Sequence, residues 1–106
     1  MHLLARVVII ASLLTFSLAS QSFAEGHTEG FGATCQEAVD MAKENANDII
    51  KSRGGEGCLG KKDGTLIRSS EMKDGMCHVT IYWSKNAGSC GQHMNKIKIL
   101  GQDVNL

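Results

Sequence analysis

The four cysteines carry the most evident chemistry in this chain: Cys35, Cys58, Cys77 and Cys90. None of them stands in a Cys-x-x-Cys pair, the spacing that thiol oxidoreductases and many zinc sites use. In an exported protein, an even number of cysteines indicates disulfide bonds rather than free thiols. We therefore expect two structural disulfides and no thiol oxidoreductase activity.

Methionine and histidine side chains form a second group with chemical capacity, because thioether and imidazole groups bind copper and zinc. They occur as Met76-Cys77-His78, as His93-Met94 and as His27. Successive strand residues point to opposite faces, so Met76 and His78 share a face that excludes Cys77. Since the sequence has no His-x-x-x-His spacing, we expect no metal and no cofactor. A periplasmic copper- or zinc-binding protein is kept as an alternative function.

Catalytic patterns in this sequence are weak. Residues 55–62 (GEGCLGKK) come within one residue of a P-loop, but Lys62 stands where magnesium binding needs a hydroxyl. His78 with Glu71 has the composition of a general base and its orienting carboxylate, yet such pairs are common as plain contacts across a hairpin. Candidate nucleophiles are Ser69, Ser84 and Ser89. With no nucleophile motif around them, we expect that the protein is not an enzyme.

The N-terminal segment indicates export. Residues 1–24 combine a basic start with an apolar stretch over residues 7–18 and a Ser-Phe-Ala cleavage site at residues 22–24. The apolar stretch is too short, and followed too soon by the cleavage site, to span a membrane. We predict a cleaved signal peptide followed by one domain, residues 25–106, in a secreted or periplasmic protein.

The charge balance bears on which partners the exported chain can bind. Once Arg6 leaves with the signal peptide, ten lysines and arginines face eleven aspartates and glutamates, a net charge of −1. This balance provides no basic surface for nucleic acid or for an anionic membrane. We expect no nucleic-acid partner, no membrane span after cleavage, and a monomer rather than a dimer.

Residues 35–53 have the clearest local pattern, that of an amphipathic helix. Thr34 and Glu37 form a capping box in front of it, and Gly54-Gly55 ends it. The apolar stripe consists of Cys35, Ala38, Val39, Ala42, Ala46, Ile49 and Ile50. Three alanines make this stripe thin, so the helix can lie close against a sheet.

Strand patterns flank the helix on both sides. Gly26–Ala33 is a weak strand candidate, and Thr65–Glu71 and Met76–Ser84 are joined through Asp74-Gly75, the favoured centre of a type I′ turn. Pairing Lys73 with Met76 places Met72 opposite Cys77, Ser70 opposite Val79, Arg68 opposite Ile81 and Leu66 opposite Trp83. Residues 94–100 form a last strand. The expected fold is α+β: a small, disulfide-stapled βαβββ domain with one helix packed on a mainly antiparallel sheet.

Chain reach and strand direction select the disulfide pairing. A helix carries the chain about 25 Å from Cys35, and the six residues that lead back to Cys58 reach at most about 20 Å, which disfavours Cys35–Cys58. Strand 65–71 then returns the chain, so Cys77 lies near the helix start and Cys90 near the loop that holds Cys58. We predict the bonds Cys35–Cys77 and Cys58–Cys90.

The solvent-facing side of the predicted sheet is the candidate binding face. It combines His78, Thr80, Tyr82, Lys96 and Lys98, with Ser84 and Ile67 beside them. Tyrosine and lysine also occur on any solvated sheet face, so composition alone does not mark a site. We expect a binding module that acts on a macromolecular partner, a protein or an envelope component, in the periplasm or outside the cell. The further alternatives are a small inhibitor of a secreted hydrolase and a minor enzyme.

Overall fold

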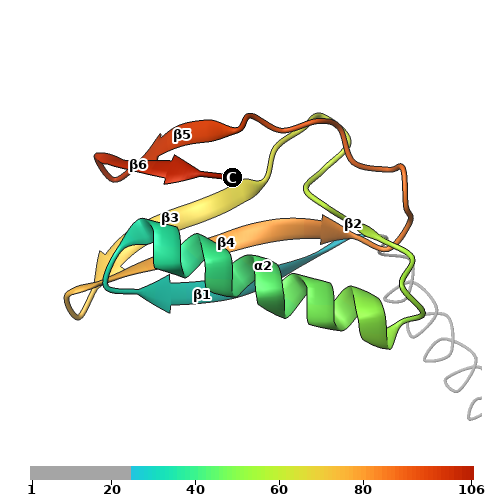
Figure 1. The fold of residues 1–106 in the computed structure, drawn as a ribbon, viewed down its shortest axis with the longest axis horizontal. Helices are drawn as coiled ribbons and strands as arrows, with labels where there is room; N and C mark the ends of the chain where they lie inside the picture. Colours follow the sequence, from blue (N-terminus) through green and yellow to red (C-terminus); the bar gives the residue numbers. More distant parts are fainter. Residues whose placement is uncertain (1–24) are drawn as a thin grey trace, which may run out of the picture.

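The computed structural model describes residues 25–106; the predicted signal peptide, residues 1–24, lies outside this range. The elements follow in the order β1 (Glu25–Gly32), α2 (Cys35–Ser52), β2 (Cys58–Leu59), β3 (Ile67–Lys73), β4 (Met76–Ser84), β5 (Lys96–Ile99) and β6 (Gln102–Asn105). Helix α2 packs on a mainly antiparallel sheet (Figure 1), which confirms the predicted α+β class. Within the described residues, no helix has the length and apolar character needed to cross a membrane.

Strand β4 is the centre of the main sheet. Antiparallel β1 pairs with it on one side, and β3 and the short β2 share its other side. The predicted turn between β3 and β4 is confirmed, because Asp74 and Gly75 both have positive φ angles, 52° and 76°. Residues Lys73, Met72 and Ser70 also pair as predicted, opposite Met76, Cys77 and Val79.

The register of β3 shifts near the beginning of the strand, and there the sequence prediction is wrong. A bulge between Ile67 and Ser69 places Ile67, not Arg68, opposite Ile81. The predicted pairing of Leu66 with Trp83 fails for the same reason: Leu66 accepts a hydrogen bond from the Tyr82 N–H instead. An extra residue at this point leaves Arg68 exposed and turns an apolar side chain toward Ile81.

Strand β1 lies against α2 with almost nothing between the two backbones. Its inward residues are Gly26, Thr28, Gly30 and Gly32, paired with Trp83, Ile81, Val79 and Cys77. The Thr28 hydroxyl donates a hydrogen bond to the Ala42 carbonyl at 2.9 Å. Ala38 and Ala42 are fully buried. The thin helix face predicted from the alanines therefore meets a strand face made of glycines, which explains why β1 appeared weak as a sequence pattern.

The end of the chain forms a hairpin of its own, which corrects the prediction of a last strand at residues 94–100. Leu100 and Gly101 have positive φ angles, 48° and 81°, and connect β5 to β6. This two-stranded sheet is separate from the main sheet. A tight turn makes local pairing the shortest route to satisfied backbone groups, so β5 pairs with the strand that follows it.

The C-terminal hairpin is fastened to the start of the helix. The Gln102 side-chain oxygen accepts a hydrogen bond from the Cys35 N–H at 2.8 Å. The Gln36 amide both donates to the Asn105 carbonyl and accepts from its N–H. Thr34 accepts from the Glu37 N–H, while the Glu37 carboxylate accepts from the Thr34 hydroxyl rather than from its N–H as predicted. The hairpin thus completes the helix cap.

Both predicted disulfides are present. Cys35–Cys77 joins the start of α2 to the start of β4, and Cys58–Cys90 joins β2 to the loop after β4. The buried core extends from the helix and β4 to the C-terminal hairpin: Cys35, Ala38, Val39, Ala42, Ala46, Ile50, Leu66, Cys77, Val79, Ile81, Trp83, Ile99 and Val104. The Cys35–Cys77 disulfide lies in this core, and the Cys58–Cys90 disulfide lies outside it.

Candidate binding sites

The outer face of the main sheet brings together part of the predicted binding face. His78 and Tyr82 are half-buried there, and Thr80 between them is only 8% exposed. The Phe31 ring stacks on His78 with a centroid distance of 5.7 Å, and the Lys61 ammonium lies 4.9 Å from the centre of the Tyr82 ring. The His78 and Tyr82 rings are thus held in fixed positions by neighbouring elements.

Lys96 and Lys98 do not belong to this face. Both lie on β5, in the separate hairpin, and Lys98 forms an ion pair with Asp103 on β6 at 2.9 Å. Ile67, also considered for the face, lines a pocket elsewhere. The predicted binding face is therefore divided between two sheets, because the turn at Leu100-Gly101 takes β5 away from the main sheet.

A small polar groove of about 110 Å³ crosses the outer face beside His78. Its lining residues are Glu29, Ser69, Glu71, Lys73, His78, Val79 and Thr80. Glu71 lies opposite His78 across the hairpin, as predicted. The His78 ring nevertheless stacks against the Phe31 ring. The residues of a hypothetical catalytic pair are therefore adjacent, while the imidazole is oriented by an aromatic ring.

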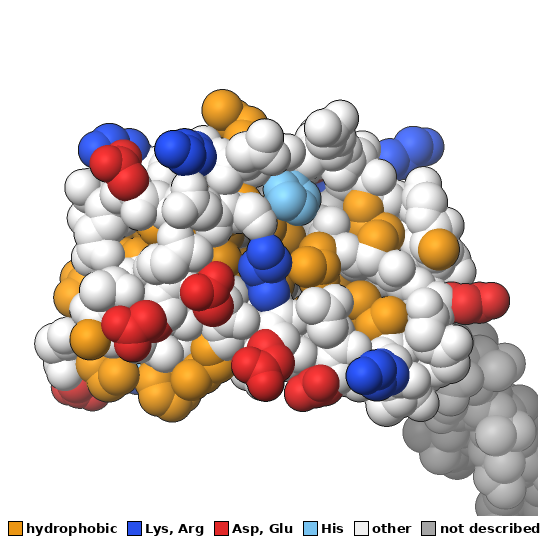
Figure 2. Space-filling view, viewed as in Figure 1, with side chains coloured by type: hydrophobic (Ala, Val, Ile, Leu, Met, Phe, Trp, Pro, Cys, Tyr) orange, Lys and Arg blue, Asp and Glu red, His pale blue; other side chains and the backbone are white. Residues whose placement is uncertain are grey.

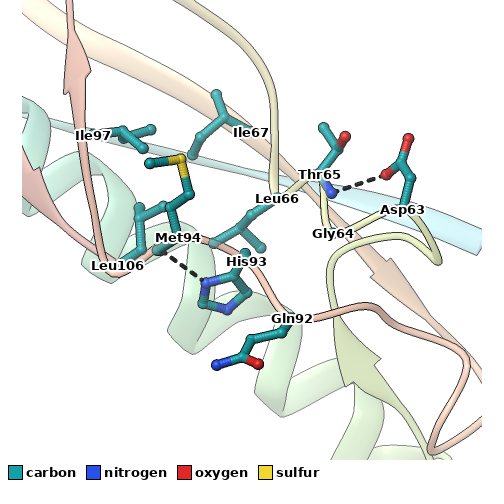
Figure 3. Close-up of a pocket in the computed structure, with 10 residues that line it drawn as sticks. All are labelled: Asp63, Gly64, Thr65, Leu66, Ile67, Gln92, His93, Met94, Ile97 and Leu106. Carbon is teal, nitrogen blue, oxygen red and sulfur yellow. Dashed lines mark hydrogen bonds between the residues drawn. The ribbon is translucent and has the colours of Figure 1, made fainter.

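A larger pocket of about 360 Å³ lies between the loop before β3 and the segment that leads into β5. We call it the loop pocket; Figure 3 shows the residues and backbone segments that surround it. The apolar lining residues are Leu66, Ile67, Met94, Ile97 and Leu106, and the others are Asp63, Gly64, Thr65, Gln92 and His93. Met94 is 69% exposed, so a large apolar side chain stands open at this pocket.

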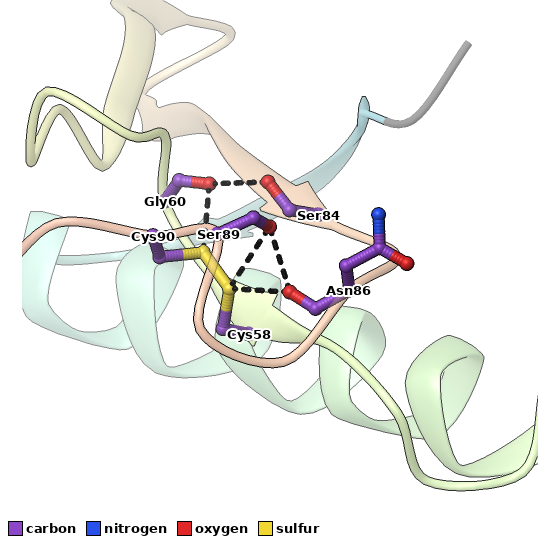
Figure 4. Close-up of a disulfide and its surroundings, with 6 residues drawn as sticks. All are labelled: Cys58, Gly60, Ser84, Asn86, Ser89 and Cys90. Atoms are coloured by element: carbon purple, nitrogen blue, oxygen red, sulfur yellow. Dashed lines mark hydrogen bonds between the residues drawn. A yellow bond between two sulfur atoms is a disulfide. The ribbon is translucent and has the colours of Figure 1, made fainter. Parts of the chain in front are cut away.

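The loop pocket has a rigid frame. The Lys61 N–H donates to the Thr65 carbonyl at 2.9 Å, and the Gly91 N–H donates to the Lys61 carbonyl at 2.8 Å. The Cys58–Cys90 disulfide links the same two loops (Figure 4). A Cβ atom at Gly91 would overlap the Lys62 carbonyl oxygen, so the loops meet backbone to backbone. The pocket walls are therefore held in place before any ligand arrives.

The rim of the loop pocket carries an ionised carboxylate. Asp63 accepts a hydrogen bond from the Thr65 N–H at 2.9 Å. This bond, followed by one from the Thr65 side chain, lowers the pKa of Asp63 below its ordinary value. The His93 Nδ1 atom lies 3.2 Å from the Met94 carbonyl oxygen, which favours a proton on Nδ1 and leaves Nε2 as an acceptor. The rim thus presents hydrogen-bonding groups around an apolar floor.

Sequence reasoning did not find the loop pocket. Its lining residues come from both sides of a disulfide and from the end of the chain, and no spacing in the sequence relates them. The only available signal was the predicted Cys58–Cys90 bond, which implies that the two polar loops lie side by side. The composition of the loops did not indicate that an apolar pocket would form beside them.

The helix side of the molecule carries acidic groups. Figure 2 shows red side chains along the face that bears α2, and its exposed residues include Glu37, Asp40, Glu44 and Asp48. A solvated acidic face is what an amphipathic helix ordinarily presents. We assign no binding role to it. Among residues 25–106, no three His, Cys, Asp or Glu side chains are grouped as metal ligands.

Comparison with known proteins finds no match among family models, curated proteins or solved structures. The function must therefore be inferred from the chemistry of the sites themselves.

Proposed function

We propose that this protein is an exported binding module that engages a protein partner in the periplasm or outside the cell. Two observations support export: the signal-peptide pattern at residues 1–24, and two disulfides, which persist in oxidising compartments. The loop pocket is the proposed contact site, and it receives an apolar side chain of the partner.

The observation that carries this proposal is the preformed frame of the loop pocket. A disulfide and two backbone hydrogen bonds hold its walls, so binding costs little conformational entropy. Leu66, Ile67 and Ile97 supply an apolar floor, and exposed Met94 can adapt its shape to an incoming side chain.

The size and polarity of the loop pocket favour a peptide segment as the occupant. At about 360 Å³ it lies near the lower end of the range for small-molecule sites. Its rim offers the Gln92 amide and the His93 ring, which match the N–H and C=O groups flanking a side chain in a peptide. An apolar side chain presented on a polar backbone satisfies both parts of the site.

Site-specific photo-crosslinking tests the proposal. A diazirine amino acid is placed at Met94 in the loop pocket, at Tyr82 on the sheet face, or at Glu44 on the outer face of α2. Each full-length variant is expressed in the native host and irradiated, and adducts are identified by mass spectrometry. The expected result is one partner polypeptide attached at position 94 and absent at position 44.

Other outcomes locate the error. An adduct at position 82 alone would move the binding site to the sheet face, and no adduct at either position would count against a binding module. Purified, oxidised protein is also titrated with copper(I) and with zinc, since the soft-metal alternative requires binding at micromolar concentrations or tighter. If the partner proves to be a secreted hydrolase, its activity with and without this protein tests the inhibitor alternative.

A further inference from the structure

The two disulfides occupy different environments. Cys35 and Cys77 are both 0% exposed and lie in the core. Cys58 and Cys90 are only partly buried. Cys58 lies on the short strand β2, and Cys90 lies in the loop after β4. A disulfide is reduced when a thiolate reaches one of its sulfur atoms, so the core bond is shielded unless the domain opens. Cys58–Cys90, which we call the loop disulfide, can be attacked in the folded protein.

The two sulfur atoms of the loop disulfide also differ in their neighbours (Figure 4). The Cys58 sulfur lies 3.4 Å from the Asn86 carbonyl oxygen and 3.8 Å from the Ser89 hydroxyl oxygen, which donates a hydrogen bond to that carbonyl at 2.7 Å. The Cys90 sulfur lies 3.3 Å from the Gly60 carbonyl oxygen. That carbonyl is also bonded by the Ser84 hydroxyl at 3.1 Å, and the Gly60 N–H is bonded to Tyr82, so it is held in place.

This asymmetry decides which sulfur leaves more easily. A thiolate on Cys58 can accept a hydrogen bond when the Ser89 hydroxyl rotates toward it. A thiolate on either cysteine would face a carbonyl oxygen, that of Asn86 for Cys58 and that of Gly60 for Cys90. The difference is the Ser89 hydroxyl, which lies beside the Cys58 sulfur. Hydrogen bonding to the charged form lowers a thiol pKa, and the sulfur with the lower pKa leaves faster. Cys58 is therefore the leaving group and Cys90 the attacked sulfur.

We infer that Cys58–Cys90 is a site of thiol–disulfide exchange with an extracytoplasmic dithiol, and that attack occurs at Cys90. The dithiol's thiolate forms a bond to the Cys90 sulfur while the Cys58–Cys90 bond breaks and its electron pair passes to Cys58. The dithiol's second thiolate then attacks the mixed disulfide and releases Cys90. Two electrons pass to the protein, two protons are taken up, and the dithiol is oxidised to its disulfide.

Exchange at this site acts on the loop pocket. Cys90 is two residues before Gln92, which lines the pocket with His93 and Met94. Without the covalent bond, the hydrogen bond from the Gly91 N–H to the Lys61 carbonyl still joins this wall to the opposite loop. If the proposed function is correct, reduction weakens partner binding while the core disulfide preserves the fold. This last consequence rests on the proposed function, whereas the exchange chemistry does not.

Timed reduction with glutathione, a monothiol, tests the inference on the oxidised protein. Samples are quenched in acid, alkylated and mapped by peptide mass spectrometry. We expect Cys58 and Cys90 to react at least about a hundredfold faster than Cys35 and Cys77, because the core pair must wait for opening. Early samples should carry glutathione on Cys90 and the alkyl label on Cys58.

Ser89→Ala is the informative variant and Ser52→Ala its matched control. Ser52 also donates its hydroxyl to the carbonyl of the residue three positions earlier, Ile49. We expect Ser89→Ala to slow reduction of the loop disulfide about three- to tenfold, the effect of one hydrogen bond, and Ser52→Ala to leave it unchanged. Equal rates for the two disulfides, glutathione on Cys58, or equal rates for the two variants would overturn the inference.

The crosslinking experiment keeps the two proposals separable. Failure of crosslinking at position 94 rejects the loop pocket as the contact site and leaves the reduction kinetics standing. Normal crosslinking with both disulfides reduced at one rate rejects only the exchange site.

Discussion

The backbone of Gly30 lies directly against the backbone of Ala38, and a Cβ atom at position 30 would overlap the Ala38 carbonyl oxygen. It would also lie 2.5 Å from the Ala42 nitrogen. Neither neighbour is a flexible side chain, so the helix would have to move. The close contact between β1 and α2 thus depends on the absence of a side chain at Gly30, and not on the packing of large apolar groups.

Gly30→Ala should therefore destabilise the protein by about 3 kcal/mol, the upper part of the range for overpacking in a core. Glu29→Ala is the control, because the exposed Glu29 side chain can be removed at a cost within about 0.5 kcal/mol. Urea unfolding of both variants measures the difference. A Gly30→Ala variant with wild-type stability would show that the helix and strand are not in close contact.

The hydrogen bond from Thr28 to the Ala42 carbonyl adds a polar contact at the same interface. Thr28→Val preserves the side-chain shape and removes the donor, so we expect a loss of about 1 kcal/mol. Thr28→Ser keeps the donor and removes a methyl group. If the valine variant is as stable as the wild type in urea unfolding, the bond makes no net contribution.

The two disulfides should contribute unequally to stability. They close similar lengths of chain, with sequence separations of 42 and 32, so the entropy term of each is alike, about 3–4 kcal/mol. Replacing Cys35 and Cys77 by alanine also leaves a cavity in the core, which should cost about 1–2 kcal/mol more than replacing Cys58 and Cys90. Thermal unfolding of the two double variants compares them directly. Identical melting temperatures would contradict the assignment of one bond to the core.

The hydrogen bond from the Thr65 N–H to Asp63 should make the loop pocket sensitive to acid. The pKa of Asp63 is lowered in the folded protein, chiefly by this bond, so its stabilising contribution is complete above the ordinary value of 3.8. The contribution is lost as the pH falls below that value and through the lowered pKa. Titration of the Thr65 amide by NMR should show a midpoint below 3.8, and Asp63→Asn should remove that titration.

The bond between Gln102 and the Cys35 N–H joins the C-terminal hairpin to the helix cap. Gln102→Ala should cost about 1 kcal/mol, as loss of a capping acceptor does. Gln102→Glu keeps an acceptor and places negative charge at a helix N-terminus, so it should retain wild-type stability or exceed it. Hydrogen exchange of the Cys35 amide reports the bond itself. Equally slow exchange in both variants would mean that Gln102 does not cap the helix.

The elements predicted correctly from the sequence are those specified within a few residues. Thr34 and Glu37 mark the start of α2, and Asp74-Gly75 marks the turn between β3 and β4. Both signals act through hydrogen bonds and φ angles of neighbouring residues, so they do not depend on the rest of the fold. The disulfide pairing was also predictable, because element direction and chain reach constrain where each cysteine can lie.

The errors occurred where the pairing and packing of elements decide the outcome. Arg68 was placed opposite Ile81 because an unbroken register was assumed, and a bulge instead exposes the charge. Lys96 and Lys98 were assigned to the face that carries His78, although β5 pairs with β6. Glycines in β1 looked unfavourable for a strand until α2 was seen to lie against them.

By itself, the sequence determined the helix, the central hairpin, the export signal pattern and the cross-links, since these follow from local backbone preferences and from chain length. Only the tertiary structure decided that β5 and β6 form a separate sheet and that two stapled loops enclose a pocket at Met94. The physical reason is that a pocket forms where separate segments of the chain meet. Its lining residues are close together in space, but no regular spacing relates them along the sequence.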